Sequence, residues 1–325
     1  MRRRSTSCLL LLCLRPTLSA CSSPLQQLCR RRRASSLRAC STAPFETAFT
    51  LQLEHGLCVA VRLPSADAGN ADSTALPLDE LHPRELDLLS DMQPARKLMY
   101  AGGRLAIRRA LRLAGAATAA DAPILSTPSG APAVFAGAMG SISHTTGLAA
   151  AYVQSNADLG GDGVGGGSGN GGEWWSRRTV GIDVESAARG VALKIATRVL
   201  APEERATLGV CASMPEHADL LLRVSIKEAL YKALHPLVRR PIRWHSVTVQ
   251  PMPDGTCTVD VGKLEKQVGM RMAAEASWRL HEGYVVSTAA AWSDQRDGVV
   301  TPTGAACRGA AANAAAAEFS ESEYP

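Results

Sequence analysis

The sequence has few aromatic residues and no apolar run long enough to cross a bilayer. Phe, Trp and Tyr make up 4% of the 325 residues, and a membrane-spanning helix needs about 20 consecutive apolar residues. Of the nine Cys residues, five lie before residue 45, and the other four are isolated, without a C-x-x-C pair. This pattern predicts reduced thiols and excludes a disulfide framework.

Acidic residues and lysine are missing from residues 1–45, which contain nine Arg. The net charge of +5 is therefore misleading, because 26 basic and 30 acidic residues remain outside this stretch. The body of the chain lacks the positive charge expected of a nucleic-acid-binding protein. A basic nucleic-acid-binding protein is an alternative that depends on the leader alone.

Residues 1–44 have the composition of a targeting segment: they are rich in Arg and Ser, lack acids and contain a short apolar run from Cys8 to Leu14. A mitochondrial or plastid transit peptide fits best, so we expect an organellar location after cleavage, with a cytosolic location as the alternative. Leu18-Ser19-Ala20 also fits a secretory signal or the first part of a two-part plastid address. A disordered, wrongly assigned N-terminus is the third interpretation.

Beyond the leader, the hydrophobic pattern predicts two strand–helix–strand halves of similar size, 45–178 and 179–293. The first half ends in a Gly-rich insertion, 155–178, and an Ala-rich tail expected to be disordered occupies 294–325. In order, we expect a hairpin over 45–63, helices over 83–89 and 94–114, a buried strand over 148–153, a strand over 179–185, a short helix from Pro202, a helix over 216–235, and hairpins over 246–261 and 275–291.

Two carboxylates lie one residue apart in the strand that begins at Thr179. Since residues i and i+2 of a strand point to the same face, Asp183 and Glu185 would project together. Like charges at short range are costly without a partner, and a divalent cation such as Mg²⁺, which prefers hard oxygen ligands, would supply one. An edge strand with two solvated acids is the alternative that these residues alone leave open.

The helix predicted over 94–114 carries a pair of arginines. Arg96 and Arg104 are eight residues apart, which places them within about 80° of each other around a helix. Both could therefore reach a single anionic ligand. A solvated basic face explains the same pair.

Two further pairs are weak signals when each is taken alone. Ser143 and His144 are adjacent in G-S-I-S-H-T and would diverge on a strand, so they cannot form a nucleophile–base pair there. Glu228 and Lys232 are helical neighbours at i and i+4, an arrangement that a surface ion pair also explains.

The order and spacing of these motifs resemble those of the 4′-phosphopantetheinyl transferases. The chain carries R-x₇-R, G-S-I-S-H-T, G-I-D-V-E and K-E-A-x-x-K-A, and Ser225 to Ala233 reads S-I-K-E-A-L-Y-K-A. The likeness is to the two-lobed, monomeric class, and within it to the bacterial siderophore-synthase branch. It covers about residues 90–290, apart from the Gly-rich insertion.

The resemblance implies an α+β fold of two pseudo-twofold-related lobes, each a small antiparallel sheet packed on a long helix, with coenzyme A in the cleft between them. The reaction would transfer the 4′-phosphopantetheine group of coenzyme A to a serine of an apo acyl- or peptidyl-carrier domain, releasing adenosine 3′,5′-bisphosphate. A non-catalytic module that binds coenzyme A or a carrier is the alternative. We expect a monomer that binds neither nucleic acid nor a membrane.

Roles for the charged residues of the second half also follow from the resemblance. Asp183, Glu185 and Glu228 would hold Mg²⁺ against the diphosphate of coenzyme A. Glu228, directly or through water, would take the proton from the carrier serine. Lys232 would contact the phosphates and, with Glu228, form the catalytic pair.

In the first half, the resemblance implies a site for the nucleotide end of coenzyme A. Arg96, Arg104 and His144 would hold the 3′-phosphate. Ser143 would lie nearby, and the loop 126–132 would face the adenine. Many relatives carry a basic residue just before the proline of this loop, and its absence here leaves room for a lower affinity for coenzyme A.

Overall fold

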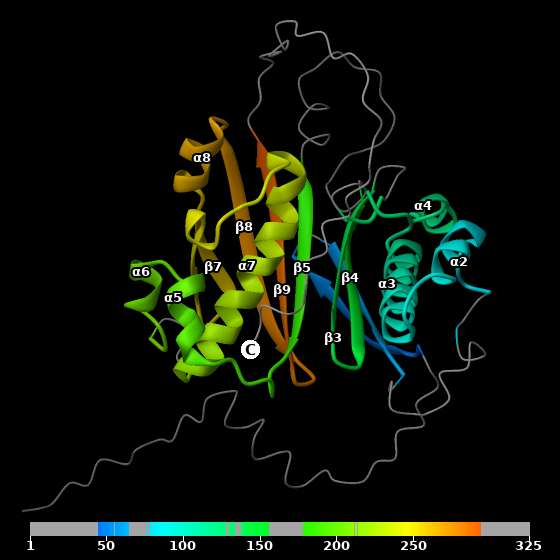
Figure 1. Cartoon of the computed structure of the whole chain (residues 1–325), viewed down its shortest axis with the longest axis horizontal. Helices are drawn as coiled ribbons and strands as arrows, with labels where there is room; N and C mark the ends of the chain where they lie inside the picture. Colours follow the sequence, from blue (N-terminus) through cyan, green and yellow to red (C-terminus); the bar gives the residue numbers. More distant parts are fainter. Residues whose placement is uncertain are drawn as a thin grey trace, which may run out of the picture. The chain divides into compact units, whose positions relative to one another are not determined.

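The computed structural model describes residues 45–293 apart from 55, 65–75, 77–78, 128–129, 134–137, 156–177, 211 and 213. The predicted leader and tail, and nearly all of the Gly-rich insertion, lie outside the described residues. The described part contains two antiparallel sheets, each packed on a long helix, so the predicted α+β fold is confirmed (Figure 1). The pseudo-twofold relation between the halves remains a prediction. Within this part of the chain, no helix has the length and apolar character needed to cross a membrane.

The first sheet has the strand order β1-β2-β4-β3, with every neighbouring pair antiparallel. Helices α2 and α3, which accompany this sheet, both begin with proline. The N–H of the first helical residue has no acceptor within the helix, so proline loses no hydrogen bond there. The elements are β1 (Thr47–Leu53), β2 (Gly56–Arg62), α2 (Pro83–Leu89), α3 (Pro94–Leu113), α4 (Ala117–Asp121), β3 (Ala138–Thr145) and β4 (Leu148–Ser155).

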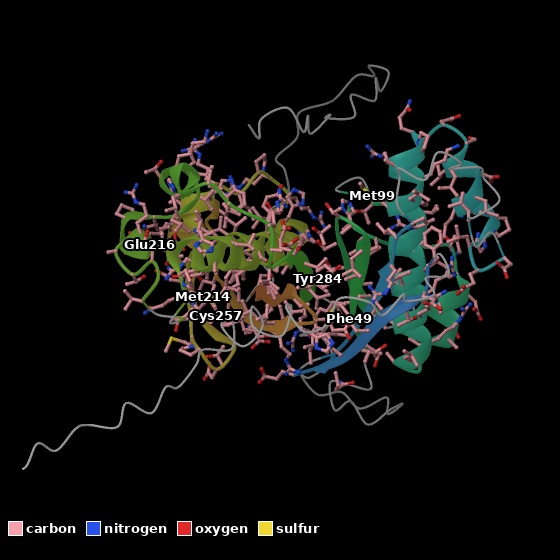
Figure 2. All side chains as sticks on the ribbon, turned by 90° about the horizontal axis from the view of Figure 1, so that it is seen from below. Phe49, Met99, Met214, Glu216, Cys257 and Tyr284 are labelled. Atoms are coloured by element: carbon pink, nitrogen blue, oxygen red, sulfur yellow. The ribbon has the colours of Figure 1, made fainter. Side chains whose placement is uncertain are left out.

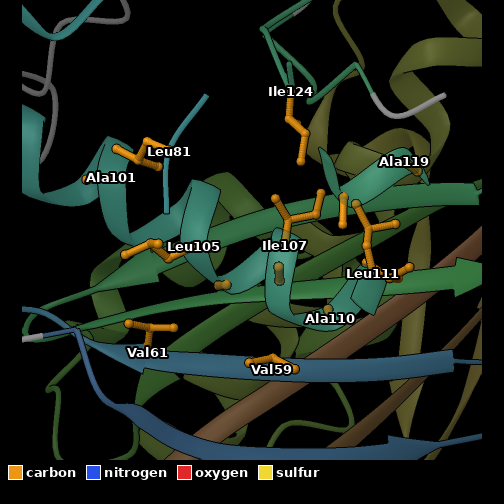
Figure 3. Packing of buried hydrophobic residues seen from close by; sticks show 14 of the residues in the cluster. Val59, Val61, Leu81, Ala101, Leu105, Ile107, Ala110, Leu111, Ala119 and Ile124 are labelled. Carbon is orange, nitrogen blue, oxygen red and sulfur yellow. The ribbon is translucent and has the colours of Figure 1, made fainter. Parts of the chain in front are cut away.

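Helix α3 packs closely on one face of this sheet because two consecutive glycines face it. A Cβ at Gly102 would lie 2.3 Å from Leu63 Cδ2, and one at Gly103 would lie 2.9 Å from Ile142 Cγ2. Leu105 and neighbouring apolar residues of α3 fill the space between the helix and the strands (Figure 3). The sequence G-G therefore sets the distance between α3 and the sheet.

The opposite face of the first sheet is buried against the second sheet. Phe49 and Tyr152 belong to the same apolar cluster as Ile182 and Val286, and Figure 2 shows the side chain of Phe49 near that of Tyr284. Strand β4 is buried along its whole length. This two-sided burial explains why its sequence is apolar from Leu148 to Val153 and does not alternate.

The second sheet has the order β5-β9-β8-β7-β6 and is covered by α7. Leu222, Ile226, Ala229 and Ala233 form an apolar stripe along α7, and all four are fully buried. The elements are β5 (Thr179–Ser186), a 3₁₀ turn η4 (Leu193–Ile195), α5 (Ala196–Val199), α6 (Pro202–Arg205), α7 (Glu216–Val238), a 3₁₀ turn η5 (Trp244–Ser246), β6 (Thr248–Pro251), β7 (Thr256–Asp260), α8 (Gly262–Val268), β8 (Met272–His281) and β9 (Tyr284–Ser293).

Gly181 allows α7 to pass directly over β5. A Cβ at this position would lie 1.9 Å from the carbonyl oxygen of Ala229, a backbone atom that cannot move without moving the helix. Asp183 follows two residues later on β5, and Glu228 precedes Ala229 on α7. The glycine therefore sets how closely these two carboxyl-bearing segments approach each other.

We expect Gly181→Ala to lower the free energy of unfolding by about 1–3 kcal/mol or more, because the added methyl group overpacks the contact between α7 and β5. Urea unfolding measures the loss. Gly190→Ala is the matched control, since a Cβ at Gly190 meets no atom within 4 Å. Equal stability of the two variants would contradict this account of the contact.

Candidate active site

The edge strands of the two sheets, β3 and β5, lie side by side (Figure 1). Hydroxyl groups of β3 accept hydrogen bonds from backbone N–H groups of β5: Ile182 donates to Ser141 Oγ at 3.2 Å and Val184 to Ser143 Oγ at 3.4 Å. These serines alternate along β3, so they point to the same side. They supply acceptors for N–H groups on the outer edge of β5, which pairs with no strand on that side among the described residues.

Asp183 is held by two side chains from different elements. The Ser143 hydroxyl donates to Asp183 Oδ1 at 2.8 Å, and Lys232 Nζ on α7 donates to the same oxygen at 3.0 Å. Lys232 also donates to Ser143 Oγ at 3.0 Å and to the Ile182 carbonyl at 2.8 Å. The i, i+4 surface pair considered for Glu228 and Lys232 is therefore not the contact that forms, because the ion pair of Lys232 in the described structure is with Asp183.

Glu185 points to the same side of β5 as Asp183. Thr145 Oγ1 of β3 donates to Glu185 Oε2 at 3.3 Å, and Arg189 Nη1 lies 2.7 and 2.9 Å from the two carboxylate oxygens. The shared face predicted for the two acids is confirmed. Strand β5 is an edge strand, but Asp183 is only 7% exposed, so the alternative of two solvated acids is wrong.

Glu228 faces this group from α7. Burial raises the pKa of its carboxyl group, the negative charges of Asp183 and Glu185 raise it further, and Lys232 opposes the shift. Burial also raises the pKa of Glu185, against the effect of its hydrogen bond with Arg189. The three acids therefore share one electrostatic environment, in which each negative charge makes the next less favourable.

The donor atoms suit a divalent cation. Asp183 Oδ2 is buried and has no hydrogen-bond partner among the described residues, and a buried unpaired carboxylate oxygen is costly unless a cation binds it. In the described part of the chain, however, no three His, Cys, Asp or Glu side chains are grouped closely enough to hold a metal ion. Asp183, Glu185 and Glu228 thus fit Mg²⁺ by chemistry, but they are not gathered around one point.

The two arginines of α3 have different surroundings. Arg104 is 6% exposed, its Nη2 donates to Ser126 Oγ at 3.1 Å, and its guanidinium lies 4.3 Å from the ring centroid of Tyr100. Its Nε is buried without a partner among the described residues. Arg96 is exposed in the first turn, and no described contact joins it to Arg104.

The dipeptide Ser143-His144 diverges as predicted, since Ser143 is buried and His144 is exposed. The hydroxyl of Ser143 is engaged by Asp183, Lys232 and the Val184 N–H. Its position therefore suits orienting the acid and the ammonium group. Its predicted contact with coenzyme A remains a prediction.

A buried ion pair beside Glu228 was not predicted from the sequence. Lys227 Nζ lies 2.8 Å from Glu204 Oε2 and also donates to the Val199, Trp244 and Val247 carbonyls. Burial lowers the pKa of Lys227, and Glu204 opposes the shift. No sequence pattern joins residues 23 positions apart on different helices, so only the three-dimensional contact identifies the pair.

Other contacts of the site were also missed. The alternation of Ser141, Ser143 and Thr145 in G-S-I-S-H-T was a usable signal, because a strand period places them on one face. The pairing of Arg189 with Glu185 had no comparable signal, since it depends on the turn after β5. Tyr100 was a usable signal as well, because it lies four residues before Arg104 in the predicted helix, where the two side chains are neighbours one turn apart.

Two family models match the chain. The model of the 4′-phosphopantetheinyl transferase N-terminal domain matches residues 84–154, and that of the 4′-phosphopantetheinyl transferase superfamily matches residues 179–289. Together they span more than half of the sequence. The chain belongs to the 4′-phosphopantetheinyl transferase superfamily. The second match includes β5 and α7, and the first includes α3 and β3, so every charged contact described above involves a matched segment.

Several solved structures are similar to part of this phosphopantetheinyl transferase. One is the Chronobacterium ammoniagenes ACPS–CoA complex, with 18% identity, a TM-score of 0.29, and coverage of 36% of this chain and 98% of that chain. Another is Helicobacter pylori holo-[acyl-carrier-protein] synthase in complex with coenzyme A, with 19% identity, a TM-score of 0.28, and coverage of 36% and 100%. A search of curated proteins finds no match. Family membership rests on the two family models, and the siderophore-synthase branch remains a prediction.

The raised pKa of Glu228 predicts a pH-dependent effect of Glu228→Gln on metal-free protein. The folded protein holds this proton more tightly than the unfolded chain, so the wild type loses stability as pH rises from below 4.5, the ordinary pKa, through the raised value. We expect the variant to be more stable than the wild type at neutral pH and similar to it below pH 4.5.

Urea unfolding with a chelator across this pH range measures the difference. Glu203→Gln is a control of opposite sign, because a hydrogen bond from Lys263 lowers the pKa of Glu203, and its contribution is lost as pH falls. A Glu228→Gln variant less stable than the wild type at neutral pH would contradict the assignment.

Proposed function

We propose that this phosphopantetheinyl transferase uses coenzyme A as donor and the serine hydroxyl of an apo acyl- or peptidyl-carrier domain as acceptor, releasing adenosine 3′,5′-bisphosphate. The observation that carries the proposal is the meeting of Asp183, Glu228 and Lys232 where β3, β5 and α7 converge. Both family models contribute an element to this point.

Glu228 is the general base in this proposal. Its raised pKa makes the ionised carboxylate a stronger base than an ordinary glutamate, which suits removal of a hydroxyl proton. Glu228 takes the serine proton, directly or through a water molecule, as the serine oxygen attacks the β-phosphorus of coenzyme A. The bond from that phosphorus to the bridging oxygen breaks, and its electron pair leaves with adenosine 3′,5′-bisphosphate.

The negative charge that spreads over the diphosphate requires nearby cations. Lys232 supplies one from a fixed position, since three acceptors orient its ammonium group while its side chain stays 28% exposed. We propose that Asp183, Glu185 and Glu228 hold Mg²⁺, which when bound neutralises charge on the diphosphate oxygens. The unpaired Asp183 Oδ2 supports this assignment.

The nucleotide end of coenzyme A is proposed to bind beside α3. Arg104 is a fixed, buried cation with an unpaired Nε, and it also contacts Ser126 at the start of the loop proposed to face the adenine. Arg96 and His144 are exposed, so they are proposed to close on the 3′-phosphate from the surface. In this arrangement the side chains that act on the diphosphate come from the second half of the chain, and those that contact the nucleotide come from the first half.

Two wider expectations, the location of the enzyme and its oligomeric state, remain proposals. The Arg-rich residues 1–44 support delivery to a plastid or mitochondrion, where the carrier would also be found. The enzyme is proposed to act as a monomer, because both halves of the site come from one chain. The identity of the carrier requires an assay with several apo-carriers.

We expect Asp183→Asn and Glu228→Gln each to lower the rate of carrier modification by about 10²–10⁴-fold, because each removes a group that acts on the transferring phosphoryl group or the serine proton. Mass spectrometry of an apo-carrier incubated with coenzyme A and Mg²⁺ measures the phosphopantetheine gain. Glu282→Gln is the control, since this acid is exposed and pairs with Arg62. Coenzyme A binding without modification of any carrier would favour the non-catalytic module.

We expect Arg104→Gln to raise the KM for coenzyme A by about 10–100-fold, the loss of one charged hydrogen bond, with a much smaller effect on 3′-dephospho-coenzyme A. The comparison tests contact with the 3′-phosphate specifically. Arg112→Gln is the matched control, because it lies on the same helix and pairs with the exposed Asp121. An equal rise for both donors would reject the 3′-phosphate contact.

A further inference from the structure

Arg189 forms the closest contact with the carboxylate of Glu185. Its Nη1 lies 2.7 Å from Oε1 and 2.9 Å from Oε2, so a single guanidinium nitrogen bridges both oxygens. The turn after β5 returns Arg189 toward the strand, with the Arg189 N–H donating to the Ser186 carbonyl at 2.8 Å. The pair is thus a product of the local backbone and requires no distant element.

The two cations beside the acids differ in how firmly they are held. Lys232 has three acceptors from β3 and β5, including a backbone carbonyl. The described contacts of the Arg189 guanidinium are with Glu185 alone, and its side chain is 54% exposed against 16% for Glu185. Arg189 can therefore move into water at little cost, whereas Lys232 is part of the framework.

We propose that Arg189 is an internal competitor for the divalent cation: it occupies both oxygens of Glu185 in the metal-free protein, and the cation must displace it to bind there. This inference rests on the proposed function, in which Glu185 is a metal ligand. A guanidinium within 3 Å of both oxygens repels a second cation that approaches the same atoms. The competition lowers the affinity for the metal.

The arrangement of the other acids agrees with this competition. Asp183 keeps an unpaired buried oxygen, while both oxygens of Glu185 are taken. In the described residues no three acids are grouped closely enough for a metal. Release of Glu185 from Arg189 is the change that would let it join Asp183, and the released guanidinium would remain near the site as a free cation.

The test is a titration of full-length, chelator-treated protein with Mn²⁺ alone, followed by calorimetry and by the electron paramagnetic resonance signal of free Mn²⁺. We expect Arg189→Gln to bind Mn²⁺ roughly two- to tenfold more tightly than the wild type, the range for a partly exposed ion pair. Lys194→Gln, which removes the same charge from the same exposed segment, should stay within about twofold of the wild type on this basis. Arg189→Lys keeps the charge and should bind like the wild type.

The outcomes separate this inference from the proposed function. Equal Mn²⁺ affinity of Arg189→Gln and the wild type overturns the inference alone, provided that the wild type binds the metal and modifies a carrier. Weaker binding by the variant also overturns it, and would show that Arg189 orients Glu185 for the metal. Failure of the wild type and the variant to bind Mn²⁺, even with coenzyme A present, overturns both the inference and the metal assignment. Thermal unfolding of each variant in chelator confirms that it is folded.

Discussion

The ammonium group of Lys232 is the contact on which the rest of the site depends. Its three hydrogen bonds reach Asp183, Ser143 and the Ile182 carbonyl, and so join α7 to the edge strands of both sheets. A half-buried ammonium group needs such acceptors, since burial without them would cost more than the ion pair returns. The absence of a Cβ at Gly181 makes the contact possible, because it lets α7 approach β5 closely enough for the lysine to reach across. Packing and electrostatics therefore specify the same geometry.

The site brings together negative charges that repel one another, and other contacts in the fold must offset this repulsion. Three acids with unfavourable mutual interactions lie near one another, and Asp183 keeps an oxygen without a partner among the described residues. Beside them, the fully satisfied pair of Lys227 and Glu204 ties α7 to α6, η5 and β6. The buried hydrogen bonds of this pair fix the rotation of α7 about its own axis. Glu228, the next residue, then stays against the other acids despite the cost of its burial.

The sequence predicted most of the longer strands and helices and the shared face of the acids, because both depend on the periodicity of strands and helices. Residues i and i+2 of β5 project together in any strand, and Ser143 and His144 diverge for the same reason. Which partner a charge selects was not predictable in this way. Lys232 is one turn from Glu228, yet it pairs with Asp183, because the close approach of α7 and β5 places a less exposed carboxylate within its reach. Predicting which partner a charged side chain selects requires the distances between elements, and local sequence patterns do not contain them.

The contact between the two sheets explains how one small molecule could be held at both ends. Arg104 belongs to the first half, and Asp183 and Glu228 belong to the second, so the spacing between a nucleotide contact and a phosphoryl contact depends on how the halves meet. They meet through an apolar cluster that includes Phe49, Tyr152 and Ile182. Close-packed apolar contacts resist small displacements. A hydrophobic core therefore sets the distance between the two ends of the proposed site. At the edge of this core, the hydroxyl groups of β3 orient the carboxylates of Asp183 and Glu185.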